Sequence, residues 1–145
     1  MIDVRPVRPS DASEVAELLT QLGYPADSDQ VRGRLDRWLH DQHGAVMVAE
    51  LDGVVAGVAA LHSMPLLEHD GNRGRLVALV VDQAYRRHGV GRALMAWAEQ
   101  EAHRRGCHQM EITSSRYREE AHRFYGELGY EDVCGRSARL MKDLS

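Results

Sequence analysis

A short stretch rich in arginine and glycine carries the clearest chemical signal in the sequence. It comprises Arg86, Arg87, His88, Gly89, Val90, Gly91 and Arg92. The apolar run Leu79–Val81 just before it predicts a buried strand, and the apolar periodicity after it predicts an amphipathic helix. A helix N-terminus presents free backbone N–H groups and the positive dipole end, and glycine lets an anion approach the backbone without a Cβ in the way. The pattern therefore predicts a site for the pyrophosphate of a nucleotide-type cofactor.

Other residue types that could act chemically give weaker signals. One segment bears side chains that could bind a divalent metal, namely His62, Glu68, His69 and Asp70. Their spacing matches no metal-ligand pattern, so we expect a solvated loop and no metal site. The two cysteines, Cys107 and Cys134, are too few for a disulfide framework, and we interpret Cys107 as a small buried hydrophobic residue.

Composition limits the classes of function. With 145 residues, 43% hydrophobic and 28% charged, the chain is predicted to form a single domain over residues 1–145. A net charge of −4 argues against general nucleic-acid binding, because such domains usually carry a basic excess. No stretch approaches the roughly 20 apolar residues of a membrane span, and no apolar leader follows Met1, so we expect a cytoplasmic protein without a membrane partner.

Hydrophobic periodicity and turn residues predict the elements that position the arginine–glycine stretch. Strands are predicted over Ile2–Val7, Val46–Leu51, Val54–Leu61, Arg75–Val81, His108–Ser115, Tyr130–Cys134 and Ala138–Met141. Helices are predicted from the cap at Asp11 to Leu22, from a cap at Ser28 to Leu39, from Gly91 to Gly106, and from Arg118 or Glu119 to Gly129. Asp11 is expected to cap the first helix, and Asp52-Gly53 predicts a tight hairpin turn. Gly57, inside a strand, predicts a bulge or a close backbone approach.

The order of these elements, β-α-α-β-β-β-α-β-α-β-β, predicts an α/β fold. The hairpins make the sheet mixed and mostly antiparallel, with six to seven strands and four helices on both faces. The strand at Arg75, the following helix and the strand at His108 are expected to form a right-handed β-α-β unit with parallel strands.

With the arginine–glycine stretch at this strand–turn–helix junction, the sequence resembles the GCN5-related N-acetyltransferase (GNAT) superfamily, whose pattern there is Gln/Arg-x-x-Gly-x-Gly/Ala. The segment Ala121–Tyr130 is similar to the family's Ala-x-x-Phe-Tyr-x-x-x-Gly-Phe/Tyr segment. The resemblance covers residues 2–143. Within the superfamily, Ala96–Ala102 and Ala121–Tyr125 are most similar to small bacterial aminoalkylphosphonate N-acetyltransferases, which bears on the substrate class only.

The resemblance implies an enzyme that uses acetyl-CoA and moves its acetyl group directly to a primary amine of a small molecule. It implies that the backbone from Arg87 to Arg92 cradles the CoA pyrophosphate, while the side chains of Arg86, Arg87 and Arg92 screen its charge. The strand at Leu79–Val81 would pair with the pantetheine arm. A backbone N–H there, such as that of Val80, would face the thioester oxygen.

The resemblance also assigns side chains to proton transfer and cofactor contact. Tyr125 matches the family tyrosine that protonates the leaving CoA thiolate, and Arg118 stands where many relatives carry a cofactor-contacting asparagine. Many relatives carry a glutamate just before the core strand, where this chain has Val77 and Ala78, so the general base is left open. The remaining candidates are Glu111, His62, Glu68 and a water relay.

Two other functions stay open at the level of sequence. One is a protein acetyltransferase that acts on lysine or an N-terminus, and the acidic stretch Glu68–Asp70 would suit a cationic acceptor of either kind. The other is a non-catalytic CoA-binding regulatory module, which the missing glutamate keeps open and Tyr125 argues against. Many relatives are dimers, so the resemblance leaves a homodimer open as well.

Overall fold

A five-stranded sheet forms the framework of residues Met1–Ile112, the first of two compact units into which the chain divides. The computed structural model describes residues 1–113 and 119–145, and the second unit spans Thr113–Ser145. The strands are β1 (Ile2–Pro6), β2 (Gly44–Leu51), β3 (Val54–Pro65), β4 (Asn72–Val81) and β5 (Cys107–Ile112). The α-helices of the first unit are α1 (Ala12–Leu22), α2 (Ser28–Leu39) and α3 (Val90–Arg104), and single-turn 3-10 helices span Pro9–Asp11 and Gln83–Tyr85.

Tight turns set the antiparallel part of the sheet. Asp52 and Gly53 have φ values of 54° and 79°, the left-handed pair that a two-residue hairpin turn needs, so the predicted hairpin between β2 and β3 is confirmed. The hairpin of β3 and β4 is longer than predicted, because pairing continues to Pro65 beside Asn72. Helix α3 then carries the chain to β5, which pairs parallel with β4. The strand order is β1-β2-β3-β4-β5.

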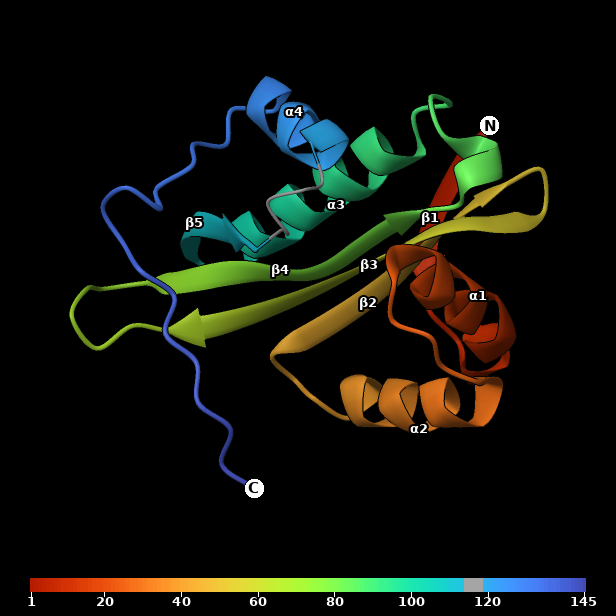
Figure 1. Cartoon of the computed structure of the whole chain (residues 1–145), viewed down its shortest axis with the longest axis horizontal. Coiled ribbons are helices and arrows are strands. Elements are labelled where there is room, and N and C mark those ends of the chain that lie inside the picture. The colour runs from red at the N-terminus through yellow and green to blue at the C-terminus, as the bar shows by residue number, and fades with distance from the viewer. Residues whose placement is uncertain (114–118) are drawn as a thin grey trace. The chain divides into compact units, whose positions relative to one another are not determined.

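Helices pack on both faces of this sheet. Figure 1 shows α1 and α2 together on one face and α3 on the opposite face. The larger core lies on the α1 and α2 side and includes Val7, Val15, Leu18, Val31, Leu35, Val48, Val58 and Val80. On the α3 side, one cluster includes Leu61, Ala102 and Cys107, with Trp97 and Met110 packed against it, and Val90, Leu94, Met95 and Ala98 of α3 are buried as well. The central strand β3 is buried on both faces from Val55 to Leu61, as its continuous apolar sequence requires.

Side chains of α3 pack tightly against β3 at Gly57. A Cβ at this position would stand 2.8 Å from Cγ1 of Val90 and 3.0 Å from Cδ1 of Leu94. The pairing of β2 with β3 also shifts here, so that Ala56 is an extra residue in the ladder. Both expectations for this glycine, a bulge and a close approach, are therefore confirmed.

Asp11 does not cap α1 as the sequence predicts, because its carboxylate is occupied elsewhere. It accepts hydrogen bonds from both terminal nitrogens of Arg5, each at 2.9 Å, and from the backbone N–H of Arg8 at 2.7 Å. The Nε of Arg5 donates to Glu50 at 2.6 Å. The Arg5 guanidinium holds the pKa of Asp11 below its ordinary value. This ion network ties β1 to β2 and to the start of α1.

The second unit contains α4 (Glu119–Glu127) and no strand among its described residues. The predicted strands around Tyr130–Cys134 and Ala138–Met141 are therefore wrong, and the sheet has five strands within the described residues instead of six to seven. A strand requires a partner, whereas the backbone here makes local turns, such as the bond from the N–H of Arg136 to the carbonyl of Val133. A few alternating apolar residues did not suffice to form a paired strand.

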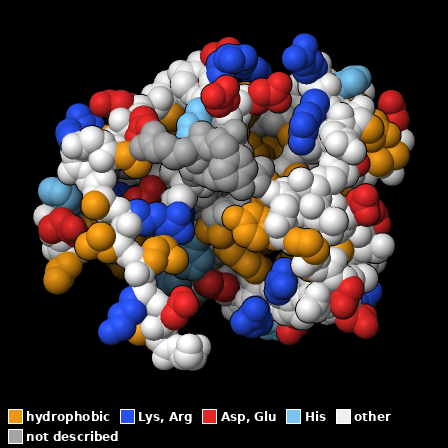
Figure 2. Space-filling model, in the orientation of Figure 1, with side chains coloured by type: hydrophobic (Ala, Val, Ile, Leu, Met, Phe, Trp, Pro, Cys, Tyr) orange, Lys and Arg blue, Asp and Glu red, His pale blue; other side chains and the backbone are white. Residues whose placement is uncertain are grey.

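The visible surface carries both signs of charge. Figure 2 shows Lys and Arg side chains interspersed with Asp and Glu, with hydrophobic side chains between them. The visible face therefore has no large field of one sign, in keeping with a net charge of −4. None of the helices in the described ranges has the length and apolar character that crossing a bilayer requires.

Candidate active site

Strand β4 continues beyond its neighbour β5. The parallel pairing ends with Leu76 beside Ile112, which is the last residue of β5. At the same point the pairing with β3 shifts, so that Val77 is an extra residue in β4. Such a bulge bends a strand and re-aims the residues that follow. Within the described residues, β4 therefore keeps β3 as its partner over residues 77–81 and presents an open edge on the other side.

Backbone alternation decides which groups face this open edge. The N–H of Asp82 donates to the carbonyl of Ala56 on β3 at 2.8 Å. Successive residues of a strand direct their backbone groups to opposite edges, so the N–H groups of Leu79 and Val81 face the open edge and that of Val80 faces β3. The side chain of Val80 lies in the core and is 4% exposed. The open edge therefore presents the N–H groups of Leu79 and Val81 and not that of Val80, which the sequence had suggested.

The turn after β4 is built from local hydrogen bonds and two left-handed residues. The Asp82 carboxylate accepts from the N–H of Ala84 at 2.9 Å, and its carbonyl accepts from the N–H of Tyr85 at 2.8 Å. Arg87 and Gly89 have φ values of 67° and 85°. The left-handed region is common for glycine and uncommon for arginine. These residues reverse the chain so that α3 begins directly after Gly89.

A bond from α1 supports this turn. The backbone N–H of Gln83 donates to Oε1 of Gln21 at 3.0 Å, which ties the last turn of α1 to the residues that follow β4. Gln21 belongs to no motif in the sequence. The two residues are 62 positions apart, and no local pattern marks the contact.

The N-terminus of α3 has the features of an anion site. The N-cap residue Gly89 offers no side-chain cap to the first N–H groups of the helix. A Cβ on Gly89 would meet only Cδ1 of Ile2, at 3.6 Å, so the backbone is open at this point. Arg86, Arg87 and Arg92 are all exposed around the turn. The N–H groups, the helix dipole and the guanidinium groups together favour a phosphate ligand here.

The candidate general bases occupy two regions of the first unit. Nε2 of His62 lies 3.0 Å from Oδ2 of Asp41, and Oε1 of Glu111 lies 3.7 Å from Nη1 of Arg75. The register of β3, β4 and β5 brings His62 and Glu111 onto one face of the sheet. Glu68 lies exposed in the loop between β3 and β4, where local backbone N–H groups lower its pKa. Within the described residues, no group of three or more His, Cys, Asp or Glu side chains is placed to hold a metal ion.

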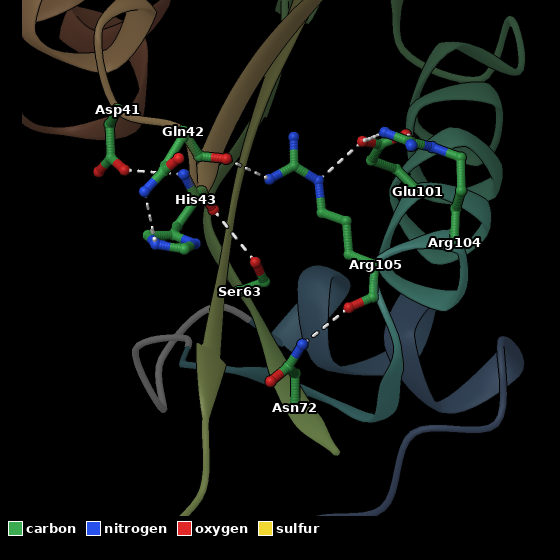
Figure 3. A network of polar contacts seen from close by, with 8 residues as sticks. All are labelled: Asp41, Gln42, His43, Ser63, Asn72, Glu101, Arg104 and Arg105. Atoms are coloured by element: carbon green, nitrogen blue, oxygen red, sulfur yellow. Dashed lines mark hydrogen bonds and ion pairs between the residues drawn. The ribbon is translucent and has the colours of Figure 1, made fainter.

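A polar network holds the loop between α2 and β2 (Figure 3). Arg105, just after α3, donates from Nη1 to the carbonyl of Gln42 at 3.2 Å and from Nε to Glu101 at 2.7 Å. The side-chain amide of Asn72, at the start of β4, donates to the carbonyl of Arg105 at 2.8 Å. The network therefore fixes the loop that carries Asp41 against the end of α3.

Tyr125 lies in α4, in the second unit. Its ring centroid is 5.4 Å from that of Phe124 and 6.1 Å from that of Tyr130. The backbone N–H of Tyr130 donates to its carbonyl at 3.0 Å. Arg118 lies outside the described residues. The roles of both residues stay predictions from the sequence motif.

Known proteins share this fold. The sequence profile described as the acetyltransferase (GNAT) family matches residues 12–130. The chain belongs to the GNAT acetyltransferase family. The matched region includes the open edge of β4, the turn before α3 and the Phe124-Tyr125 segment. The predicted superfamily is thus confirmed, and the protein is an acyltransferase of the N-acetyltransferase type.

Individual relatives agree with this family. The aminoalkylphosphonate N-acetyltransferase of Salmonella typhimurium is 34% identical to this GNAT chain over 118 residues, which are 81% of this chain and 74% of that protein. A crystal structure of a transcriptional regulator from Bacillus halodurans C-125 has a TM-score of 0.86 at 21% identity, covering 99% of both chains. An aminoglycoside N-acetyltransferase in complex with CoA has a TM-score of 0.82 at 21% identity, covering 100% of this chain and 95% of that one. The two solved structures show the fold alone.

Proposed function

We propose that this GNAT protein transfers the acetyl group of acetyl-CoA to a primary amine of a small molecule, within a ternary complex and without an acetylated enzyme intermediate. One observation carries the proposal: the open edge of β4 leads directly into the turn that opens α3. An extended ligand with a pyrophosphate at one end suits this succession. The names of two similar proteins support the acceptor class, since one acts on aminoalkylphosphonates and the other on aminoglycosides.

The open edge and the helix N-terminus would hold different parts of CoA. The backbone groups of Leu79 and Val81 would pair with the amides of the pantetheine arm, as a neighbouring strand would. The N–H groups from Arg87 to Arg92 would hold the pyrophosphate, and Arg86 would add positive charge beside it. The uncapped start of α3 and the open space at Gly89 fit this ligand.

The residues at the open edge would also assist the acyl transfer. Acetyl-CoA supplies an acetyl group as a thioester, whose thiolate leaves when an amine attacks the carbonyl carbon. A C–N bond forms, the C–S bond breaks, and the products are an acetamide and free CoA. An N–H of Leu79 or Val81 would donate to the carbonyl oxygen as negative charge develops on it.

Proton transfer must accompany this exchange. An alkyl ammonium with a pKa of about 10 has to lose a proton before its nitrogen can attack, and the departing thiolate has to gain one. We assign the second step to the phenol of Tyr125, because Tyr125 stands in the family's Phe-Tyr motif. The attacking nitrogen loses a second proton as the amide forms, and this proton restores the phenol. Starting from the ammonium, the reaction therefore releases one proton to solvent.

The cofactor is tested by thermal unfolding with acetyl-CoA and, separately, with NAD. A ligand that binds the native state at 100 times its Kd adds about 2.7 kcal/mol to the free energy of unfolding, so we expect a clear rise in Tm with acetyl-CoA alone. An equal change in Tm with acetyl-CoA and with NAD would refute the proposed cofactor.

The reaction is tested by thiol release from acetyl-CoA across a panel of small primary amines. Tyr125→Phe should lower kcat by about 100-fold, within the usual range for a general acid. Tyr130→Phe is the matched control, since it removes a neighbouring phenol, and it should retain kcat. Full turnover by Tyr125→Phe would refute the assignment of the acid. If the protein bound acetyl-CoA but released no thiol from it with any small amine, a protein acceptor or a regulatory module would be favoured instead.

A further inference from the structure

The loop after α2 holds an aspartate against a histidine of the sheet. Nε2 of His62, on β3, lies 3.0 Å from Oδ2 of Asp41. The other carboxylate oxygen of Asp41 accepts a hydrogen bond from the backbone N–H of His43 at 2.9 Å. This N–H and the His62 ring both lower the pKa of Asp41, so its carboxylate is ionised at neutral pH and can only accept hydrogen bonds. Nε2 of His62 therefore carries a proton and donates it to Asp41.

The other ring nitrogen of His62 is left with a lone pair. A neutral imidazole that carries its proton on Nε2 is an acceptor at Nδ1. Nδ1 makes no hydrogen bond to any other residue that the structure describes. Cδ2 faces Gly44 of β2, where a Cβ would stand 3.5 Å from it, and Nδ1 lies on the opposite side of the ring. The lone pair is therefore turned away from β2, on a side chain that is 38% exposed.

Packing around the ring fixes this arrangement. The ring of His62 meets that of Trp38 on α2 edge-on, with centroids 6.0 Å apart, and that of His43 at 6.4 Å. Arg105 donates to the carbonyl of Gln42 at 3.2 Å and so holds the loop that carries both His43 and the aspartate (Figure 3). An aspartate that fixes the tautomer and orientation of a histidine is the arrangement by which Ser-His-Asp sites prepare a base.

His62 lies on the face of the sheet that a small molecule can approach. The next residue toward the core on this face, Ala60, belongs to the cluster under α1 and α2. Arg75 and Glu111 share the face by strand register, and their side chains are 48% and 47% exposed. Leu61 points to the opposite face, where it is buried in the cluster on the α3 side. An acceptor can therefore reach this end of the sheet from the α1 and α2 side, whereas α3 covers the other side.

The distance from His62 to the open edge fits a relay through one water. Ala59 of β3 pairs with Leu79 at the open edge, and His62 pairs with Arg75. Ala59 and His62 are three residues apart, which is about 10 Å along the strand at about 3.3 Å per residue. A bridging water spans about 5–6 Å, the length of two hydrogen bonds of about 2.8 Å each. The imidazole and one water can therefore reach an amine that is bound beside the thioester.

Charged groups of both signs surround His62. The charged and titratable side chains that face this region are Asp41 and His43 of the loop after α2, Arg34 and Arg37 of α2, Arg75 of β4 and Glu111 of β5. Asp41 is hydrogen-bonded to the ring, so it stabilises the positive charge that the imidazole gains with a second proton.

We propose that His62 is the general base that removes the proton of the acceptor ammonium through one bridging water, and that Asp41 positions its ring. Nδ1 takes a proton from the water, and the water takes one from the ammonium. The acceptor nitrogen keeps the electron pair of the broken N–H bond and attacks the thioester carbon with it. The imidazolium then returns its proton to solvent. This inference rests on the proposed function, because it supplies the step that frees the attacking amine.

The test uses the pH dependence of the acceptor itself, since an alkyl ammonium with a pKa of about 10 loses its proton without help as the pH rises. We would measure kcat/KM by CoA release from pH 7 to 9, with the fastest acceptor among n-propylamine, ethanolamine and putrescine. At pH 7, His62→Gln should lower kcat/KM by about 100-fold. This deficit should shrink by about tenfold for each unit of pH, because the neutral amine becomes tenfold more abundant. A merely structural loss would not recover in this way.

Three further variants make the test specific. The amide of Asp41→Asn can donate to Nε2, which moves the ring proton to Nδ1 and removes the lone pair, so this variant should show the same recovery with pH. Glu111→Gln, at the competing carboxylate, should show no deficit that recovers with pH. His40→Gln is the matched control, because Nδ1 of His40 also lies near an aspartate, 3.6 Å from Asp36, and it should retain kcat/KM throughout.

The outcomes separate this inference from the proposed function. A His62→Gln protein with the kcat/KM of wild type at pH 7, or with a deficit that stays constant from pH 7 to 9, would overturn the base while CoA release by wild type upheld the transfer reaction. A deficit that recovers with pH in Glu111→Gln alone would overturn it in favour of Glu111. If His62→Gln did not fold, the pH profile of Asp41→Asn would decide. If wild type released no CoA with any amine, the proposed function would fail and this inference with it.

Discussion

A methyl group added at Gly57 should displace the start of α3 and thereby disturb the proposed cofactor site. A Cβ there would lie 2.8 Å from Cγ1 of Val90, 3.0 Å from Cδ1 of Leu94 and 3.0 Å from the carbonyl oxygen of Val80. The carbonyl belongs to β4 and cannot rotate away. Val90 is 1% exposed and is the first residue of α3. The methyl group of Gly57→Ala should therefore push the N-terminus of α3 away from the sheet.

The expected cost of Gly57→Ala follows from this crowding. Overpacking of a core by a methyl group costs about 1–3 kcal/mol, and 1 kcal/mol lowers Tm by roughly 2–4 °C in a chain of this size. We therefore expect Tm to fall by roughly 2–12 °C. Because the first turn of α3 forms the proposed anion site, the KM for acetyl-CoA should rise more than the KM for the acceptor.

Two further variants make this prediction specific. Gly33→Ala adds the same methyl group in α2, where nothing lies within 4 Å, and should raise stability by about 1 kcal/mol through helix propensity. Val90→Ala removes the atom that crowds Gly57. Val90→Ala alone opens a cavity, so its effect is judged by a double-mutant cycle, in which we expect a favourable coupling of about 0.5–3 kcal/mol with Gly57→Ala.

The assays are thermal unfolding and initial rates of CoA release for the four proteins of the cycle and for Gly33→Ala. A Gly57→Ala protein with unchanged Tm and unchanged KM for acetyl-CoA would refute the reasoning. Zero coupling with Val90→Ala would show that the contact with α3 is not the cause.

Two stability predictions rest on the ion networks. The Arg5 guanidinium holds the folded pKa of Asp11 below its ordinary 3.8, so this carboxylate stabilises the fold above that pH and loses its effect as the pH falls through the folded value. Asp11→Asn should lower the free energy of unfolding, measured in urea at pH 7, by about 3–5 kcal/mol. The variant should then lose less stability than wild type as the pH is lowered. An equal loss in acid would contradict the assignment. Arg104 and Arg105 both pair with Glu101, but their side chains are 70% and 20% exposed. Arg105→Gln should lower the free energy of unfolding in urea by about 1–2 kcal/mol, and Arg104→Gln should leave it unchanged. Equal losses in the two variants would contradict the role of the Arg105 network.

Local patterns predicted most of the first unit. The Asp52-Gly53 turn, the close approach at Gly57 and the strand before the arginine–glycine stretch are properties of short segments, and all three are present in the structure. The strands predicted after α4 are absent from the described residues, because pairing depends on a partner that a local alternation cannot specify. The cap expected at Asp11 is absent for a similar reason, since Arg5 and Arg8 occupy its carboxylate.

The sequence by itself determined the turn chemistry and the family. Residue types and spacings within a few positions decide both, as at Arg86-x-x-Gly89-x-Gly91 and Phe124-Tyr125. Only the tertiary structure decided the direction of the backbone groups at Val80 and the meeting of Arg75 with Glu111. These features depend on strand register, where a bulge of one residue changes which groups face the open edge. The sequence therefore predicted where a phosphate would bind, and the register of β4 identified the open edge proposed for acyl transfer.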